Sequence, residues 1–478
     1  MSFISIEFVL LFSCTFILFH TVNIRYKTYI LLAASAAFIG FYHIGFLITA
    51  ILVSLSSFYL GQWIDLSTNE KCRKKRFVIG IVTLILCWLA FKYDNYIMSF
   101  IHMLFVNKKT LSDQPSPIFF PLGISFYTFQ ALSYLTEVYW QEERSEKELP
   151  DFMLYMLFFM KFLSGPIERS KDMLSQIKSK KVVEYHFLVQ GTLLIAIGLI
   201  KKLILAGYIA PYIDGIFNSI HTASGAQLLM ACLLYPIELY GDFSGYTDIA
   251  LGGSYMLGFK LSNNFNRPFI AQTTADFWRR WHMSLSFWIR DYLYMPLSAA
   301  LRKWEEKGIF LSLMITFVAL GMWHGTGWNY VIYGAIQGVV ICYEMKTPKL
   351  HKWIKNKLGY PLFAALSIIR TYLIFAISLI FFRLDSVREA IYYIRHISFH
   401  VNSTWKEINI GMPDHNCIVA GSALVMILVY EYFMDKQNLF ELLGRQPICV
   451  RWGVYYLLII ILFALGQFSS DNFIYLQF

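Results

Sequence analysis

One histidine stands inside an otherwise apolar stretch at residues 321–330, which read GMWHGTGWNY. This residue, His324, is flanked by Trp323, Gly325 and Gly327. A titratable ring at membrane depth is costly unless it faces protein or a water-filled cavity, so it is a candidate functional group. A neutral imidazole can take a proton from a hydroxyl near neutral pH, and glycine lets a substrate or another backbone approach closely. The segment therefore predicts a general base; the alternative is a packed core histidine bonded to a carbonyl.

A second group of polar and aromatic residues lies at 276–294, DFWRRWHMSLSFWIRDYLY. On a helix, at about 100° per residue, one face is polar; it carries Arg279, His282, Ser286 and Arg290, with Asp276 at its edge. The opposite face carries Trp278, Trp281, Leu285 and Trp288. Such a helix suits the membrane interface or the rim of a polar cavity, where arginines reach phosphates or carboxylates. An anchor that only binds lipid headgroups is the alternative, but an anchor has no need of the imidazole of His282.

A third group is a polar cluster between two apolar runs, formed by Asp242, Ser244, Tyr246, Thr247 and Asp248. Buried carboxylates need cationic partners, and the nearest abundant cations in the sequence are Arg267, Arg279 and Arg280. We therefore expect the two carboxylates to pair with these arginines. Paired buried charges are more often architectural than reactive, so the pairing is expected to hold the arginine-rich helix in place.

The elements that position these groups are expected to lie in a membrane. Of the 478 residues, 57% are hydrophobic and 15% are charged, against about 25% charged in soluble proteins, and the mean hydropathy is +0.51. The net charge of +10 lies mostly in short basic connections, which usually stay cytoplasmic and meet anionic headgroups. Because these basic clusters are scattered between apolar runs and form no stripe, a nucleic-acid-binding function is not expected.

Apolar runs of about the length that spans a bilayer, 17 to 25 residues, recur along nearly the whole chain. They lie near residues 3–20, 28–60 (two runs), 77–105, 118–139, 151–165, 186–213, 226–260 (two runs), 309–324, 327–345, 361–383, 417–434 and 452–468. Several are short or interrupted by Gly and Pro, which predicts re-entrant pieces around a cavity. The first run has no basic region before it and no cleavage site after it, so a retained first helix is expected.

We therefore expect an all-α polytopic membrane protein, a bundle of roughly 11–13 transmembrane helices with re-entrant segments, in one domain over residues 1–478. The polar stretches at 141–151 and 384–416 are expected to be loops or interfacial helices. The seven cysteines lie far apart and form no C-x-x-C pair, so neither a disulfide framework nor a zinc site is expected.

Two further segments, FFPLGISFYTFQALSYLTEVY at 119–139 and KFLSGPIERS at 161–170, complete a series of five motifs. In this order, PLGISFYTFQ, SGPIERS, DFSGYTDIALG, FWRRWHMSLSFWIRDYLYMPL and MWHGTGWNY with YGAIQG behind it resemble the membrane-bound O-acyltransferase (MBOAT) family. The resemblance is strongest over about residues 118–345. It is closest to the bacterial branch that includes alginate O-acetyltransferases and the D-alanyl transfer proteins of teichoic acid modification. The ending DNFIYLQF also resembles the alginate type.

The resemblance implies a funnel-shaped bundle of membrane helices with the central family histidine at His324 and the second family histidine at His282. One departure concerns residues 298–302, which read SAALR where alginate-type members usually have a Gly-Gly-Asn-Arg turn. That departure leaves the acceptor or the partner protein open. It does not affect the expected transfer chemistry.

Acyl transfer from a thioester to a hydroxyl needs a base and donors that stabilise an oxyanion. His324 is the candidate base. His282, Asn329, tryptophan rings or backbone N–H groups are the candidate donors, with further substrate-binding or supporting roles expected for Arg279, Ser286, Arg290, Asp242 and Trp323. The sequence holds no Gly-x-Ser-x-Gly elbow or Cys-His signature of a covalent nucleophile, so direct transfer, or relay to a serine of a partner, is expected.

We therefore expect a multi-pass protein of the inner or plasma membrane that exports a small acyl group, acetyl, to hydroxyls of an extracytoplasmic polysaccharide. The co-substrate would be a cytoplasmic thioester such as acetyl-CoA or an acyl carrier protein, with no bound cofactor and no metal. The resemblance implies an extracytoplasmic partner with an SGNH, esterase-like site. D-alanyl transfer to teichoic acid and a transporter or flippase remain alternatives. Broken helices with polar groups at mid-membrane would suit a transporter, although no paired halves are evident.

Overall fold

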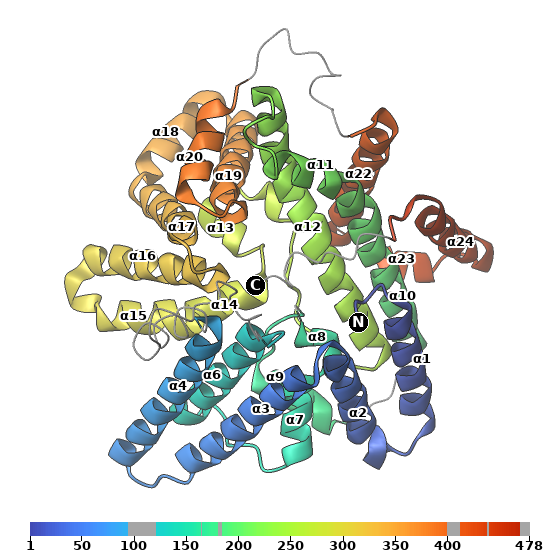
Figure 1. Cartoon of the computed structure of the whole chain (residues 1–478), viewed down its shortest axis with the longest axis vertical. Coiled ribbons are helices and arrows are strands. Elements are labelled where there is room, and N and C mark those ends of the chain that lie inside the picture. Colours follow the sequence, from blue (N-terminus) through green and yellow to red (C-terminus); the bar gives the residue numbers. More distant parts are fainter. Residues whose placement is uncertain (94–120, 164, 180–183, 399–411, 437–438, 469–478) are drawn as a thin grey trace, which may run out of the picture. The chain divides into compact units, whose positions relative to one another are not determined.

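The fold was obtained as a computed structural model, which describes residues 1–93, 121–163, 165–179, 184–398, 412–436 and 439–468 (Figure 1). Every regular element in these ranges is a helix. The described residues form two compact units, one made of residues 1–184 with 254–262 and the other of residues 185–253 with 263–478. Whether the chain acts as a single domain stays a prediction. The end of the run expected at 77–105 and the C-terminal motif DNFIYLQF lie outside the described residues.

Six helices are long and apolar enough to cross a membrane within the described ranges. They are Ile44–Asp65, Tyr185–Phe217, Arg302–His324, Tyr360–Arg383, Asp414–Met434 and Ile448–Leu465. The expectation of an all-α multi-pass membrane protein is therefore confirmed. The total of 11–13 spans remains a prediction, since it depends also on helices that fall short of these criteria.

The first unit is a set of packed helices in which the expected apolar runs become separate elements. They are α1 (Ile6–Thr21), α2 (Ile24–Tyr42), α3 (Ile44–Asp65), α4 (Glu70–Lys92), α6 (Ile124–Trp140), α7 (Leu149–Leu157), α8 (Phe159–Phe162) and α9 (Ser170–Lys178). The side chains of Ser5, Asn23, His43 and Asn69 cap the first four N-termini by accepting a backbone N–H of the first turn. These caps set the boundaries between consecutive apolar runs.

The second unit begins with one long helical segment that changes pitch. It consists of α10 (Tyr185–Leu199), the π-helical turn η1 (Ile200–Ala206) and α11 (Gly207–Phe217). The backbone of this segment lies against α12 (Gly225–Met256) at a pair of glycines, Gly198 and Gly245. A Cβ at either glycine would lie 2.5–2.6 Å from the carbonyl oxygen of the other. Only glycine permits this approach of two helix backbones.

The run at 226–260, expected to form two helices, is instead the single 32-residue helix α12. It contains Pro236, which removes one backbone donor without ending the helix, as membrane helices often tolerate. The residues that follow α12 form only short helical pieces. They are η2 (Pro268–Ile270), α13 (Thr274–Trp278), α14 (Met283–Ile289), η3 (Arg290–Tyr294), α15 (Met295–Ala300) and η4 (Arg302–Trp304). None of these could span a bilayer alone, which needs about 20 residues.

The rest of the second unit is made mainly of longer helices. They are α16 (Glu305–His324), α17 (Trp328–Lys346), α18 (Pro348–Leu358), α19 (Tyr360–Arg383), α20 (Val387–His396), α22 (Asp414–Lys436), α23 (Leu439–Gly444) and α24 (Ile448–Leu465). α16 and α17 form a tight hairpin (Figure 1). A Cβ at Gly321 would lie 2.1 Å from the Tyr330 carbonyl oxygen, and one at Gly334 the same distance from that of Phe317. The two glycines therefore set how closely the hairpin packs.

Candidate active site

His324 is the last residue of α16, and the turn of residues 325–327 leads from it into α17. Its side chain is buried, with 4% of its surface exposed. Three aromatic rings surround the imidazole: the centroid of Trp323 lies 4.6 Å away, that of Phe382 5.1 Å and that of Tyr333 5.9 Å, all near edge-to-face. The histidine predicted as the general base is therefore positioned by packing from α16, α17 and α19.

The glycines of the turn serve the packing of the protein itself. A Cβ at Gly325 would lie 2.0 Å from the ring of Tyr330, so the hairpin closes only because that position is glycine. The sequence left open whether the glycines admit a substrate or another part of the chain. At Gly321 and Gly325, atoms of Tyr330 occupy the space.

Asn329 is buried at the start of α17, and its amide nitrogen donates to two backbone carbonyls, those of Phe381 at 3.1 Å and Leu384 at 2.8 Å. These carbonyls belong to the last turn and the C-cap of α19, where a helix leaves its C=O groups without partners. Asn329 thus joins the turn after His324 to the end of α19. Its two N–H groups are used for that purpose.

His282 lies in a break between α13 and α14, and its φ of 43° is left-handed. The continuous helix expected over residues 276–294 is therefore wrong. A non-glycine residue in this region is strained, and the surrounding loop holds it: Asn264 Oδ1 accepts from the backbone N–H of Ser284 at 3.2 Å and lies 3.4 Å from Nδ1 of His282. The ring packs edge-on against Phe243 of α12, with centroids 4.8 Å apart.

The break also divides the expected polar stripe. His282 is buried, whereas Arg279 and Arg290 are exposed, and the guanidinium of Arg290 pairs with Asp291 at 2.7 Å. The hydroxyl of Ser286 donates to the carbonyl of Trp281 at 3.0 Å, which places it against its own turn. The face expected to be apolar is buried in the protein, because Trp278, Trp281, Leu285 and Trp288 each expose 7% or less of their surface.

A chain of hydrogen bonds connects this region to the helices around His324. The indole N–H of Trp278 donates to Gln337 Oε1 at 3.1 Å, and the Gln337 amide donates to the hydroxyl of Ser378 at 2.8 Å. Gln337 lies one helical turn after Tyr333 on α17, and Ser378 lies one turn before Phe382 on α19. Both histidine segments therefore pack on the same two helices.

The buried carboxylates of α12 pair with lysines, so the expected pairing with arginines is wrong. Asp242 pairs with Lys202, and Asp248 pairs with Lys201 at 2.9 Å. Both lysines lie in the π-helical turn η1. Arg280 instead pairs with Asp276 at 3.0 Å, four residues earlier. Asp242 is thus part of the framework behind Phe243.

Lys201 extends this framework to α22. Glu431 Oε1 lies 3.7 Å from the Lys201 ammonium and also accepts a hydrogen bond from the hydroxyl of Tyr240. Within the parts of the chain that the structure describes, no three His, Cys, Asp or Glu side chains gather in a way that could hold a metal ion.

The profile of the membrane-bound O-acyltransferase family matches residues 139–383, which include both histidine segments. A probable alginate O-acetylase AlgI of Pseudomonas aeruginosa is 30% identical over 445 residues, which cover 91% of this chain and 82% of that protein. The chain belongs to the membrane-bound O-acyltransferase family. The resemblance carried by the five motifs is confirmed, and with it the activity class: the protein is an O-acyltransferase.

Two other relatives are named for acceptors other than alginate. A peptidoglycan O-acetyltransferase of Helicobacter pylori is 25% identical over 457 residues, 86% of this chain and 84% of that protein. A teichoic acid D-alanyltransferase of Bacillus subtilis is 34% identical over 245 residues, 49% of this chain and 62% of that protein. The family therefore fixes the reaction class and leaves the acyl group and the acceptor to be assigned.

Several supporting residues were not identified from the sequence. Asn264 has no local signal in the sequence, yet its side-chain and backbone oxygens accept from the backbone N–H groups of Ser284 and Met283, directly after His282. Tyr333 and Phe382 pack edge-to-face against the His324 ring and lie 9 and 58 positions after it in the chain. Tyr333 could have been found from the sequence, because it is the first residue of the motif YGAIQG. Phe382 lies outside the five motifs and has no local signal.

Proposed function

We propose that this O-acyltransferase moves an acetyl group from a cytoplasmic thioester to hydroxyls of an extracytoplasmic polysaccharide, with His324 as the general base. The observation that carries the proposal is a buried imidazole, ringed by aromatic side chains, within the matched family segment. A catalytic base must be shielded from bulk water and held in one orientation. The packing around His324 supports both requirements.

The proposed chemistry needs no covalent intermediate on the chain. The imidazole takes the proton of the acceptor hydroxyl while the alkoxide oxygen forms a bond to the thioester carbonyl carbon. As the tetrahedral intermediate collapses, the C–S bond breaks and the thiolate takes the proton back from the imidazolium. One ester and one thiol are formed, and the histidine returns to its neutral state.

An oxyanion forms on the carbonyl oxygen during this step and needs hydrogen-bond donors. We assign this role to His282 rather than to Asn329, because both N–H groups of Asn329 are used by carbonyls of α19. Trp323 acts by packing against the base. Arg279 and Arg290 are exposed and are assigned to anionic groups of a substrate or of lipid.

The acetyl group and the polysaccharide acceptor are inferred from the alginate O-acetylase and peptidoglycan O-acetyltransferase relatives. An inner or plasma membrane location follows, because the donor thioester is cytoplasmic and the acceptor is outside. We also propose an extracytoplasmic partner with a Ser-His-Asp type site that completes transfer to the polymer. D-alanyl transfer is the second candidate, supported by the 34% identity to the teichoic acid D-alanyltransferase.

The test is ester analysis of surface polymers in cells that carry the wild-type protein, His324→Gln or the control His415→Gln. His415 is an exposed histidine at the start of α22. We expect base-labile acetate to disappear with His324→Gln and to stay at the wild-type level with His415→Gln at equal protein abundance. Wild-type ester content in the His324 variant would overturn the assignment of the base. Release of D-alanine instead of acetate would select the second candidate.

A further inference from the structure

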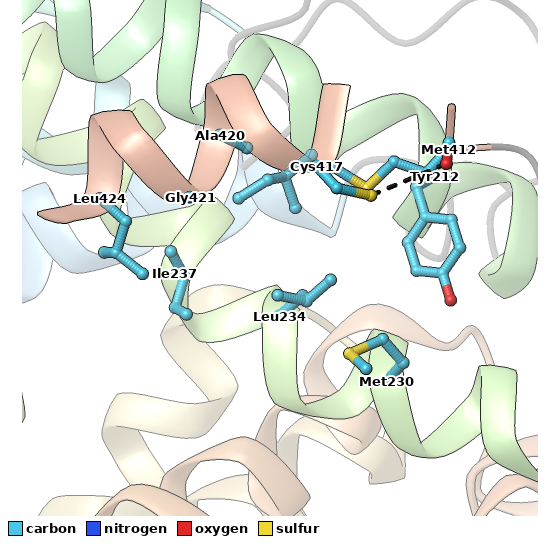
Figure 2. Close-up of a pocket in the computed structure, with 10 residues that line it drawn as sticks. Tyr212, Met230, Leu234, Ile237, Met412, Cys417, Ala420, Gly421 and Leu424 are labelled. Carbon is cyan, nitrogen blue, oxygen red and sulfur yellow. Dashed lines mark hydrogen bonds between the residues drawn. The ribbon is translucent and has the colours of Figure 1, made fainter. Parts of the chain in front are cut away.

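The second unit contains a groove between α11, α12 and α22 that no step of acyl transfer uses. Its volume is about 180 Å³, and its lining is almost wholly apolar. Tyr212 of α11, Met230 and Ile237 of α12, and Met412 and Leu424 at the α22 side mark its extent. Figure 2 shows the side chains of α12 and α22 on opposite walls of the groove, with open space between them.

The groove runs parallel to the helices that form it. Met412 lies just before the start of α22 and Leu424 lies twelve positions after Met412, while Met230 and Ile237 are seven positions apart on α12. At 1.5 Å per residue these spacings correspond to about 10–18 Å. The hydrocarbon core of a bilayer is about 30 Å thick, so the groove covers about the depth of one leaflet. This is the direction and the length of a lipid acyl chain.

The surroundings of the groove also indicate a hydrocarbon ligand. α11 ends the span Tyr185–Phe217 and α22 provides the span Asp414–Met434. The outer face of α22 exposes Ile418 to 68% and Val425 to 61%, so hydrocarbon is the solvent around this helix. An apolar cavity of this size does not hold water stably. Two methionines of the lining, Met230 and Met412, can adapt to the shape of a flexible chain.

We propose that this groove binds one acyl chain of a membrane phospholipid, with the glycerol end near Met412 and the methyl end near Leu424. The bound chain fills the space between α22 and the α11–α12 pair. It adds to the Lys201–Glu431 and Tyr240–Glu431 interactions, which join α22 to the rest of the unit deeper along the helix. The lipid is a structural ligand in this proposal, separate from the acyl donor.

Gly421 offers a direct test because it lines the groove on α22 and a Cβ there would meet no atom within 4 Å. The Cβ of Gly421→Leu therefore meets no neighbouring atom, and the rest of its side chain is expected to occupy the space of the acyl chain. Gly453→Leu is the matched control: this glycine lies in the membrane-spanning helix α24, and its Cβ would also meet nothing within 4 Å. Both changes bring the same gain in helix propensity.

The measurement is native mass spectrometry of the full chain purified in detergent, which counts retained phospholipids. We expect the wild type and Gly453→Leu to carry one more phospholipid than Gly421→Leu, with occupancy reduced about tenfold in the latter, or about 1.4 kcal/mol. Equal phospholipid occupancy in all three proteins would overturn the proposal.

A second measurement uses only the wild-type chain and does not depend on how the variants fold. A phospholipid with a photoreactive diazirine in the middle of one acyl chain is added to vesicles that contain the protein. We expect adducts on both walls of the groove, including the α12 residues between Met230 and Ile237. Adducts confined to outward-facing positions of α22, such as Ile418 and Val425, would overturn the proposal.

Discussion

The two buried histidines of the second unit are positioned by different kinds of interaction. His324 ends a long helix and is held by three aromatic rings and by a hairpin that glycines close. His282 occupies a strained, left-handed position in a loop and is held by hydrogen bonds centred on Asn264. The His324 ring is held by van der Waals packing, whereas the His282 ring is held by a few hydrogen bonds. The two sites should therefore fail in different ways when they are changed.

The largest expected effect is on the turnover number, which should fall further when His324 is replaced than when His282 is replaced. His324→Gln should lower the turnover number between about 100-fold and 10,000-fold, since it removes general base catalysis. His282→Gln should lower it about 100-fold, as expected for loss of one oxyanion donor. Initial rates of ester formation at saturating donor would measure both. A His282 variant with full activity would show that this ring only packs against Phe243.

The next prediction concerns the packing that holds His324. In Gly321→Ala the added Cβ would lie 2.1 Å from the Tyr330 carbonyl oxygen, so the α16–α17 hairpin must open. Overpacking of this kind costs about 1–3 kcal/mol. Thermal unfolding in detergent would show a lower midpoint than that of Gly453→Ala, whose Cβ meets nothing. Equal midpoints would mean that the hairpin adjusts freely.

The hydrogen bonds around His282 give a smaller and more selective prediction. Asn264→Ala removes the oxygen that accepts from Ser284 and lies beside His282, at a cost of about 1–2 kcal/mol. Asn264→Asp keeps an oxygen at the same place and should retain most of the stability. We expect turnover to fall in the alanine variant and to recover in part in the aspartate variant. The same loss in both would point to the amide nitrogen instead.

The smallest expected effect is on the pH dependence of stability and comes from Glu143 in the first unit, outside both histidine segments. Burial raises the pKa of Glu143 from near 4.5 to about 7. The folded state therefore keeps a proton that the unfolded chain releases, so this contribution to stability is full below pH 4.5 and is lost as the pH rises through 7. Glu143→Gln should remove about 1–2 kcal/mol of that pH dependence. An unchanged pH profile of thermal unfolding would contradict this.

The sequence predicted the fold class and singled out His324 because both depend on local signals. Apolar runs became helices with ends within a few residues of those expected, as in α16, α17 and α19. His324 was identified because a lone polar ring in an apolar run is rare. The two runs expected at 226–260 proved to be one helix, since Pro236 removes a single hydrogen bond and does not end α12.

The features that the sequence did not predict depend on contacts between distant segments. Helical periodicity assumes regular dihedral angles, so it could not place the left-handed His282 between two short helices. The partners of Asp242 and Asp248 were sought among nearby arginines, whereas the lysines that pair with them lie 40 and 47 positions earlier in the chain. Proximity in sequence is a poor guide to charge pairing when helices pack side by side.

The π-helical turn η1 has an evolutionary consequence. A π-helical segment amounts to one extra residue inserted into an α-helix. Deletion of any single position between 200 and 206 would restore ordinary pitch and rotate everything beyond it by about 100°. Lys201 and Lys202 would then lose their common alignment with Asp248 and Asp242, and Tyr212 would turn out of the groove. This stretch can drift by substitution, but descendants that shorten it by one codon should be absent.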